Sequence, residues 1–167
     1  VDAFDVWLEL KGEDDSGRTI FWSGKVEDNG KGPVEPGAHF YRSYQLDATG
    51  NPINKRNAWQ ARSVLYVRLI PPGAADVAHY LVRVPRDAKG HIHFTAKLNY
   101  RKFSWYYTHF SYAGEPKPRQ SRFLLASDHN GLEYTFDAKN IPRDVSGEIK
   151  GQIPDLPIIT LSQAQVS

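Results

Sequence analysis

Three histidines occupy positions where an imidazole could bind a metal ion or a haem. His91 and His93 alternate within one predicted strand, so their side chains point to the same face. Two imidazoles at this spacing could share a metal ion, although the sequence places no third ligand beside them. His39 follows a Pro-Gly turn, where it could be an axial ligand to a haem held by a neighbouring segment. Hydrogen-bonded or solvent-facing imidazoles are the alternative, and we expect that ordinary role at all three positions.

An unusual aromatic run covers residues 99–110, where basic residues are interleaved with rings. Such a run can stack on sugars or nucleobases. One face of a sandwich strand is buried, however, so about half of these rings should belong to the core. Trp105, Tyr106 and Tyr107 are consecutive, so at least one of them must point outwards. We therefore predict an exposed binding patch of these three residues and Arg101, for a partner protein or a glycan.

Carboxylates and amides gather in the glycine-containing turns. Oxygen ligands of this kind can bind calcium in extracellular β domains, but no stretch has the spacing of an EF-hand loop. Asp and Asn also favour turns because their side chains hydrogen-bond to the turn backbone. We expect this turn role for Asp14, Asp15, Asp28, Asn29 and Asp47.

No motif of a known catalytic chemistry is present. The sequence contains no Gly-x-Ser-x-Gly, no His-Glu-x-x-His and no phosphate-binding loop. It has no cysteine, which excludes disulfides, thiolate metal sites and covalent haem attachment through Cys-x-x-Cys-His. The 21 basic and 19 acidic residues give a formal net charge of +2, which does not indicate nucleic-acid binding. No apolar run approaches the roughly 18 residues that cross a membrane. We predict a non-enzymatic chain with no cofactor of its own.

The elements that must position these residues are short alternating runs, interrupted by 13 glycines and 11 prolines. This pattern is typical of a β-sandwich or barrel. We predict an all-β fold, an immunoglobulin- or fibronectin-like antiparallel β-sandwich with long decorated loops. It should form a single domain over residues 1–162, with residues 163–167 as the start of a linker. The expected extended runs are 4–10, 18–26, 39–46, 63–70, 76–84, 91–100, 132–136 and 156–161.

The predicted core depends on which face of each strand is buried. In the run 91–100, alternate apolar residues define the expected core face, namely Ile92, Phe94, Ala96, Leu98 and Tyr100. We expect Phe94, Leu98 and Tyr100 to be buried.

Six segments together resemble one known family. They are 19–24 (TIFWSG), 36–43 (PGAHFYRS), 54–59 (NKRNAW), 69–76 (LIPPGAAD), 98–103 (LNYRKF) and 156–161 (LPIITL). In this combination and order, the chain is similar to the β module of bacterial multihaem c-type cytochromes that also contain tetratricopeptide repeats. In that family the module follows the haem-binding part and precedes the repeats.

The resemblance implies a bacterial extracytoplasmic protein, periplasmic, at the cell surface or secreted, that transfers electrons through haem c. Because this chain has no haem-attachment motif, any haem would belong to other parts of a longer parent protein. We therefore predict a structural, docking or assembly module. Its expected partner is the haem-bearing segment or other copies of the parent protein. A glycan-binding sandwich module that uses exposed aromatic residues is the alternative function.

Overall fold

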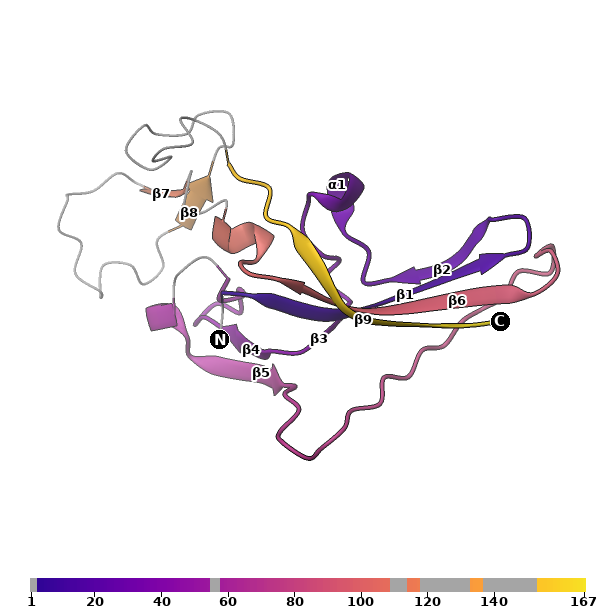
Figure 1. Ribbon diagram of the computed structural model, residues 1–167. Coiled ribbons are helices and arrows are strands. Elements are labelled where there is room, and N and C mark those ends of the chain that lie inside the picture. The colour runs from indigo at the N-terminus through magenta and orange to yellow at the C-terminus, as the bar shows by residue number, and fades with distance from the viewer. Residues whose placement is uncertain (1–2, 55–57, 109–113, 118–132, 137–152) are drawn as a thin grey trace. The chain divides into compact units, whose positions relative to one another are not determined.

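A computed structural model describes residues 3–54, 58–108, 114–117, 133–136 and 153–167 (Figure 1). Most of its regular elements are strands, which confirms the all-β class. In chain order they are β1 (Asp5–Asp14), β2 (Thr19–Ser23), α1 (Glu27–Gly30), β3 (His39–Phe40), β4 (Ser43–Leu46), the 3-10 turn η1 (Ala58–Gln60), β5 (Ser63–Val67), β6 (Ile92–Arg101), β7 (Gly114–Lys117), β8 (Glu133–Phe136) and β9 (Ile158–Val166). No helix in these described ranges is long and apolar enough to cross a membrane.

The chain divides into two compact units where the sequence predicted one domain. The first unit comprises residues 1–4, 43–67 and 103–156, and the second comprises 5–42, 68–102 and 157–167. In the first unit β4 pairs with β5 and β7 pairs with β8, both antiparallel. The predicted strand 39–46 is divided between the units, because β3 belongs to the second and β4 to the first.

The second unit contains a five-stranded antiparallel sheet in the order β2-β1-β6-β9, with β3 also paired to β1. Strands β1 and β2 form the predicted hairpin. The long strands β1, β6 and β9 run side by side (Figure 1). Residues 163–166, predicted to begin a linker, are instead paired with β6 as the last part of β9. The β-pairing therefore continues beyond the predicted boundary at residue 162.

The apolar core of the second unit forms around Trp7, which is fully buried. The indole N–H of Trp7 donates to the carbonyl of Gly24 at 3.0 Å. Gly24 has a φ of +77°, and a side chain there would collide with the backbone oxygen of Leu8. This glycine therefore lets the chain leave β2 close to β1. The returning segment then packs the remaining core residues against the ring, namely Val34, Ala38 and Phe40.

At its C-terminal end, β6 buries the face opposite to the predicted one. Phe94, Leu98 and Tyr100 are only half-buried, whereas Asn99 and Arg101 are each 3% exposed. The register explains this reversal, because Asn99 pairs with Trp7 and therefore shares its covered face. Alternation showed that β6 has two different faces, but the chain between β2 and β3 decides which one is covered.

A buried ion pair lies at the end of this face. The guanidinium of Arg101 donates to Oδ2 of Asp5 at 3.1 Å and to the carbonyl of Gly32 at 2.8 Å. Arg42 approaches the second carboxylate oxygen of Asp5 at 3.6 Å, with its guanidinium over the Phe40 ring. Charged groups can occupy this interior because they are paired with one another.

The extended run predicted at 76–84 forms no strand. The chain turns at Pro71, whose carbonyl accepts the N–H of Ala74 at 3.0 Å, and Gly73 takes a φ of +79°. The described residues 68–91 contain no strand pairing. Because this segment lies on no sheet, its apolar residues do not enter a sheet-covered core.

Candidate functional site

The predicted aromatic patch lies in a helical turn and not in a strand. Residues 105–108 are helical, and the hydroxyl of Ser104 accepts the N–H of Tyr107 at 3.2 Å. The rings of Trp105 and Tyr106 meet edge to face, with centroids 5.1 Å apart. The ring of Phe103 stacks on that of Tyr107 at 5.2 Å. Trp105, Tyr106 and Tyr107 are all half-buried. Each of their rings also contacts another aromatic ring.

Arg101 does not contribute to an exposed patch. It belongs to the second unit, whereas residues 105–107 belong to the first. Its guanidinium is buried and hydrogen-bonded to Asp5. The sequence could not distinguish this role, because a basic residue beside aromatic residues is equally compatible with an exposed ligand contact.

His39 connects β3 to the segment after β5. Its Nε2 atom lies 2.8 Å from Oδ2 of Asp76, and its ring meets that of Tyr41 edge to face at 5.3 Å. The hydrogen bond with His39 is the main reason why the pKa of Asp76 lies below its ordinary value. His39, considered above as a candidate haem ligand, therefore contacts a carboxylate through its imidazole.

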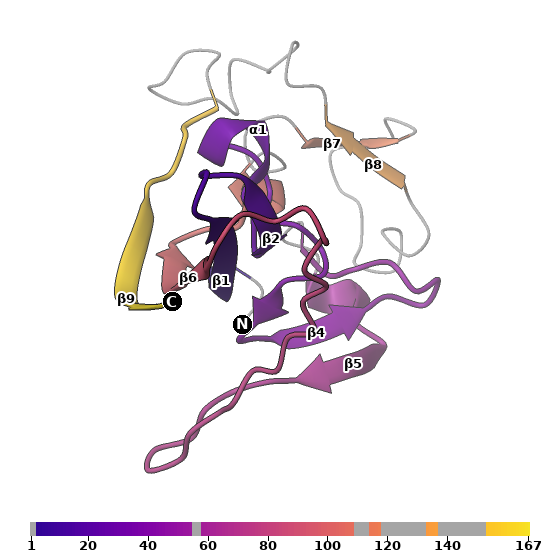
Figure 2. The same cartoon turned by 90° about the vertical axis from the view of Figure 1, so that its right-hand side faces the viewer.

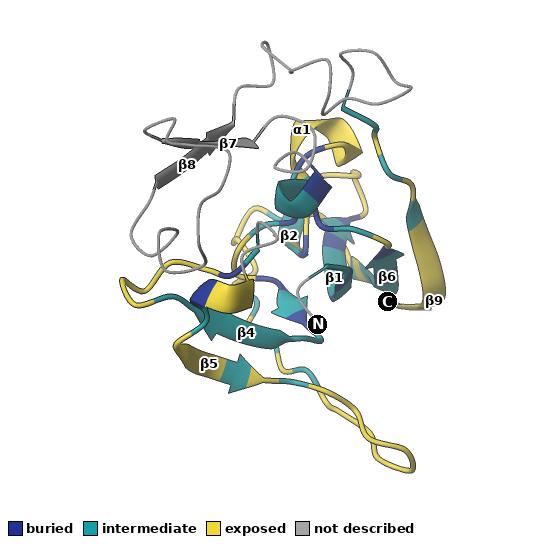
Figure 3. Ribbon diagram, turned by 90° about the vertical axis from the view of Figure 1, so that its left-hand side faces the viewer, coloured by how far each residue is buried: buried dark blue, intermediate teal, exposed yellow. Residues whose placement is uncertain are grey.

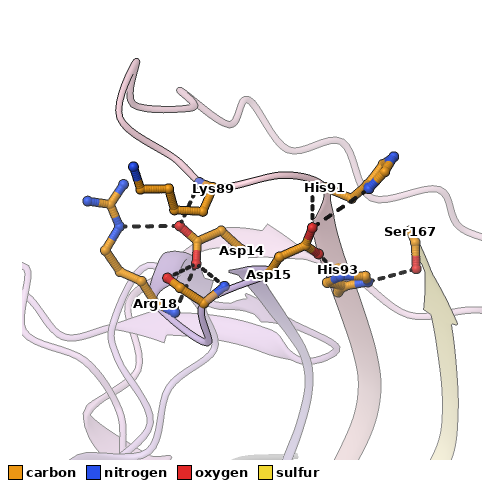
Figure 4. Close-up of polar contacts among 8 residues, drawn as sticks. Asp14, Asp15, Arg18, Lys89, His91, His93 and Ser167 are labelled. Atoms are coloured by element: carbon orange, nitrogen blue, oxygen red, sulfur yellow. Dashed lines mark hydrogen bonds and ion pairs between the residues drawn. The ribbon is translucent and has the colours of Figure 1, made fainter.

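His91 and His93 both approach the carboxylate of Asp15 (Figure 4). Nε2 of His93 lies 2.6 Å from Oδ1, and Nδ1 of His91 lies 3.8 Å from Oδ2. The other nitrogen of His93 lies 2.8 Å from the hydroxyl of Ser167. The hydrogen bond with His93 is the main cause of the lowered pKa of Asp15. Among the described residues, no group of three or more His, Cys, Asp or Glu side chains could hold a metal ion.

Asp14 organises the neighbouring turn (Figure 4). Its Oδ1 accepts the backbone N–H groups of Ser16 and Arg18 at 3.0 and 3.1 Å. Its Oδ2 accepts the N–H of Lys89 at 3.0 Å. The hydroxyl of Ser16 also donates to Oδ1 of Asp14. This hydrogen bond above all, together with those from the backbone, lowers the pKa of Asp14 to about 2. The predicted turn role is therefore confirmed at Asp14, which also binds a segment distant in sequence.

The other turn residues behave in two ways. Oδ1 of Asp47 accepts the N–H groups of Thr49 and Asn51, both at 2.8 Å, as expected for a turn. Asp28 and Asn29 lie in α1 with positive φ angles of 48° and 54°. This left-handed conformation is one that Asp and Asn adopt more readily than most residues.

Residues 68–90 form a long exposed segment, which we call the apolar arm. Five of its large apolar side chains are 48% to 86% exposed, namely Leu69, Ile70, Val77, Leu81 and Val84, whereas Val82 is half-buried. Figure 2 shows the arm as a long excursion after β5, and Figure 3 colours most of it as exposed. An arm with so many exposed apolar side chains is the most distinctive surface of the second unit.

Contacts along its length hold the apolar arm to the second unit. At its start, the N–H of Arg68 donates to the carbonyl of Arg42 at 3.0 Å. At its centre, the ring of Tyr80 meets that of Phe21 edge to face, with centroids 5.9 Å apart. The contacts of Asp76 and Lys89 described above add to these, as does a paired hydrogen bond from Arg18 to Asp87 at 2.8 and 3.2 Å. The arm is therefore attached through polar and aromatic groups, while five of its large aliphatic side chains are exposed.

The sequence contained one signal for this arm. Pro71, Pro72 and Pro85 flank the alternating run at 76–84, and proline cannot donate to a strand ladder. Prolines at these positions predict strand ends. They also isolate the run from its neighbours, which explains why it joins no sheet.

No protein-family model, no curated protein and no solved structure matches this chain. The functional assignment therefore depends on the contacts above and on the resemblance carried by the six sequence segments.

Proposed function

We propose that this chain is a non-catalytic docking module of a bacterial extracytoplasmic multihaem electron-transfer protein. The observation that carries the proposal is the apolar arm, in which five large apolar side chains are 48% to 86% exposed. Leu81, the most exposed, lies between Val77 and Val84, so the apolar groups are spread along an extended backbone. An exposed apolar surface of this kind is typical of a protein–protein contact.

The energetics favour a partner for the arm. Each large aliphatic side chain gains about 1.5 to 3 kcal/mol when it moves from water to a fully apolar environment. Binding also costs the entropy of ordering mobile segments. The contacts of Asp76, Tyr80 and Lys89 hold the arm before any partner arrives. Part of the ordering cost is therefore met during folding, which leaves more of the apolar gain for binding.

The proposed identity of the partner comes from the family resemblance. We propose that the arm packs on the haem-bearing segment of the same parent protein, which would carry the haem c groups absent from this chain. We also propose the fold type, an immunoglobulin-like antiparallel β-sandwich. The antiparallel sheet order β2-β1-β6-β9 supports this fold type but is shared with other all-β architectures.

The gene that encodes this chain provides the first test. Haem-attachment motifs before the chain and helical repeats after it are expected in the flanking sequence. The encoded haem-bearing segment is then purified and titrated with the 167-residue chain by calorimetry. We expect saturable binding. Flanking sequence without haem motifs, or a haem-bearing segment that does not bind, would refute the proposal.

The glycan-binding alternative remains a prediction with less structural support. The rings of residues 105–107 are half-buried and engaged with other rings. Trp22 is 38% exposed, but the ammonium groups of Lys11 and Lys25 lie 4.8 and 5.2 Å from its ring centroid. A sugar that stacks on this indole must compete with the two lysines for the aromatic surface.

A further inference from the structure

Among the residues that the structure describes, strand β9 is an edge of the sheet in the second unit. It pairs with β6 on one side and is the last strand in the order β2-β1-β6-β9. Residues 159–166 are all exposed, including Ile159, Leu161 and Val166. The nine residues of β9 include no charged residue, no proline and no glycine. Natural edge strands usually carry such residues because they prevent pairing with other chains.

The opposite edge, β2, also has no charge, proline or glycine within its five residues, but positive side chains lie beside it. Lys11 and Lys25 lie over its exposed Trp22, and Arg18 immediately precedes the strand. Lysine side chains that lie over an edge strand disfavour the addition of a further strand there. β9 is the longer of the two edges, and its own nine residues carry no charge.

We propose that β9 pairs antiparallel with β9 of a second copy of this chain, joining two sheets into one. The pairing is centred on Ala164. It places Gln163 opposite Gln165 of the second copy, and Ser162 opposite Val166, twice by symmetry. The β-bulge between the partners of Leu98 and Asn99 leaves Leu161 unpaired with β6 and ends the regular stretch there. Amide side chains opposite one another can hydrogen-bond, as in Gln ladders.

The absence of charge on β9 favours a second copy of this chain as the strand that pairs with it. A neutral strand offers no attraction to a charged peptide, whereas two copies of β9 meet without like-charge repulsion. The nearest charge on the neighbouring strand is Lys97, which pairs with Gln163. In the joined sheet, the two copies of Lys97 are separated by at least three strand spacings, about 14 Å. This exceeds the screening length of roughly 8 Å at physiological salt.

This inference goes beyond the docking function, because it uses a different surface and needs no haem-bearing segment. The full chain alone is examined by sedimentation equilibrium over increasing protein concentration. Two double variants change the same two positions and differ only in the sign of the charge at residue 165. Q163E/Q165E opposes like charges twice across the pairing, whereas Q163E/Q165K opposes unlike charges twice.

The wild-type chain is expected to dimerise, and Q163E/Q165E to raise the dimer dissociation constant about tenfold over Q163E/Q165K. Equal dissociation constants for the two variants would overturn the proposal, as would a wild-type chain that stays monomeric at millimolar concentration. A monomeric chain that still binds the haem-bearing segment refutes β9 pairing alone, whereas a dimer without that binding refutes the docking function alone.

A cysteine crosslink tests the register independently. The chain has no native cysteine, so every disulfide must involve the introduced residue. Directly opposed residues in antiparallel strands have Cα atoms about 4.5 to 5.5 Å apart, within disulfide range. Ala164→Cys should form a disulfide dimer under mild oxidation, whereas Ile159→Cys, beyond the bulge, should not. Equal crosslinking of the two variants would exclude the proposed register.

Discussion

Nε2 of His39 lies 2.8 Å from Oδ2 of Asp76, so a residue of β3 holds the middle of the apolar arm. The two residues are separated by 37 positions in the sequence, and their contact belongs to the second unit. Because the arm has no strand partner, side-chain contacts such as this one fix its path. The docking proposal requires that these contacts order the arm without covering its aliphatic groups.

Loss of this contact should loosen the arm. Asp76→Asn weakens the charge-assisted hydrogen bond with His39, so amide hydrogen exchange in residues 74–84 should accelerate. His91→Gln is the control, since its side chain is 83% exposed and approaches Asp15 only at 3.8 Å. Amide hydrogen exchange in the arm should be the same in His91→Gln as in wild type. Equal protection of the arm in wild type and Asp76→Asn would show that another contact orders it.

Acid should destabilise the protein through Asp14, Asp15 and Asp76. The pKa of each lies below its ordinary value of 3.8 in the folded state, and that of Asp14 falls to about 2. A lowered carboxyl pKa contributes stability that is present above pH 3.8 and is lost as pH falls through the folded value. Urea unfolding measured at decreasing pH should show this loss. Asp14→Asn should make the dependence shallower between pH 3.8 and about 2, and an unchanged slope would contradict the assignment.

Trp7 should be the most sensitive apolar position of the second unit. Trp7→Ala removes a fully buried ring and its hydrogen bond to Gly24, so the free energy of unfolding should fall by about 3 to 5 kcal/mol. Trp22→Ala is the matched control, because this indole is partly exposed. Its effect in urea denaturation should be clearly smaller. If the two variants lost similar stability, the core would not be centred on Trp7.

The Asp5–Arg101 pair should respond differently to single and double substitution. Arg101→Met leaves the buried carboxylate of Asp5 without its main partner, at a cost of about 3 to 5 kcal/mol of unfolding free energy. Adding Asp5→Leu removes that isolated charge, so the double variant should recover much of the loss. A double-mutant cycle in urea measures this coupling. Strictly additive losses would mean that the pair is not an isolated buried unit.

Part of the fold could be predicted from local pattern alone. The β1–β2 hairpin follows from two alternating runs around a Gly17 turn, and β6 follows from the alternation after Gly90. The covered face of β6 could not be predicted, because Asn99 and Arg101 look like surface residues until their partners are known. Those partners, such as Asp5, are distant in sequence.

In the candidate sites too, local pattern predicted some features, whereas contacts between residues distant in sequence determined others. The convergence of His91 and His93 on one side follows from period-two geometry, but Asp15 as their shared contact comes from tertiary structure. The run at 105–107 is rich in residues that favour strands, yet it follows Ser104, a good helix N-cap residue. The apolar arm was missed because alternation alone cannot show whether a run has a neighbouring strand.

The most direct test of the account is the affinity of the chain for the haem-bearing segment of its parent when the arm alone is altered. Val77→Ser with Leu81→Ser changes exposed groups, so stability should change by no more than about 0.5 kcal/mol per site. Binding measured by calorimetry should weaken at least about tenfold. Leu161→Ser changes an apolar side chain outside the arm that is 56% exposed, and this variant should bind like wild type. Wild-type affinity in the Val77/Leu81 double variant would contradict the docking role of the arm.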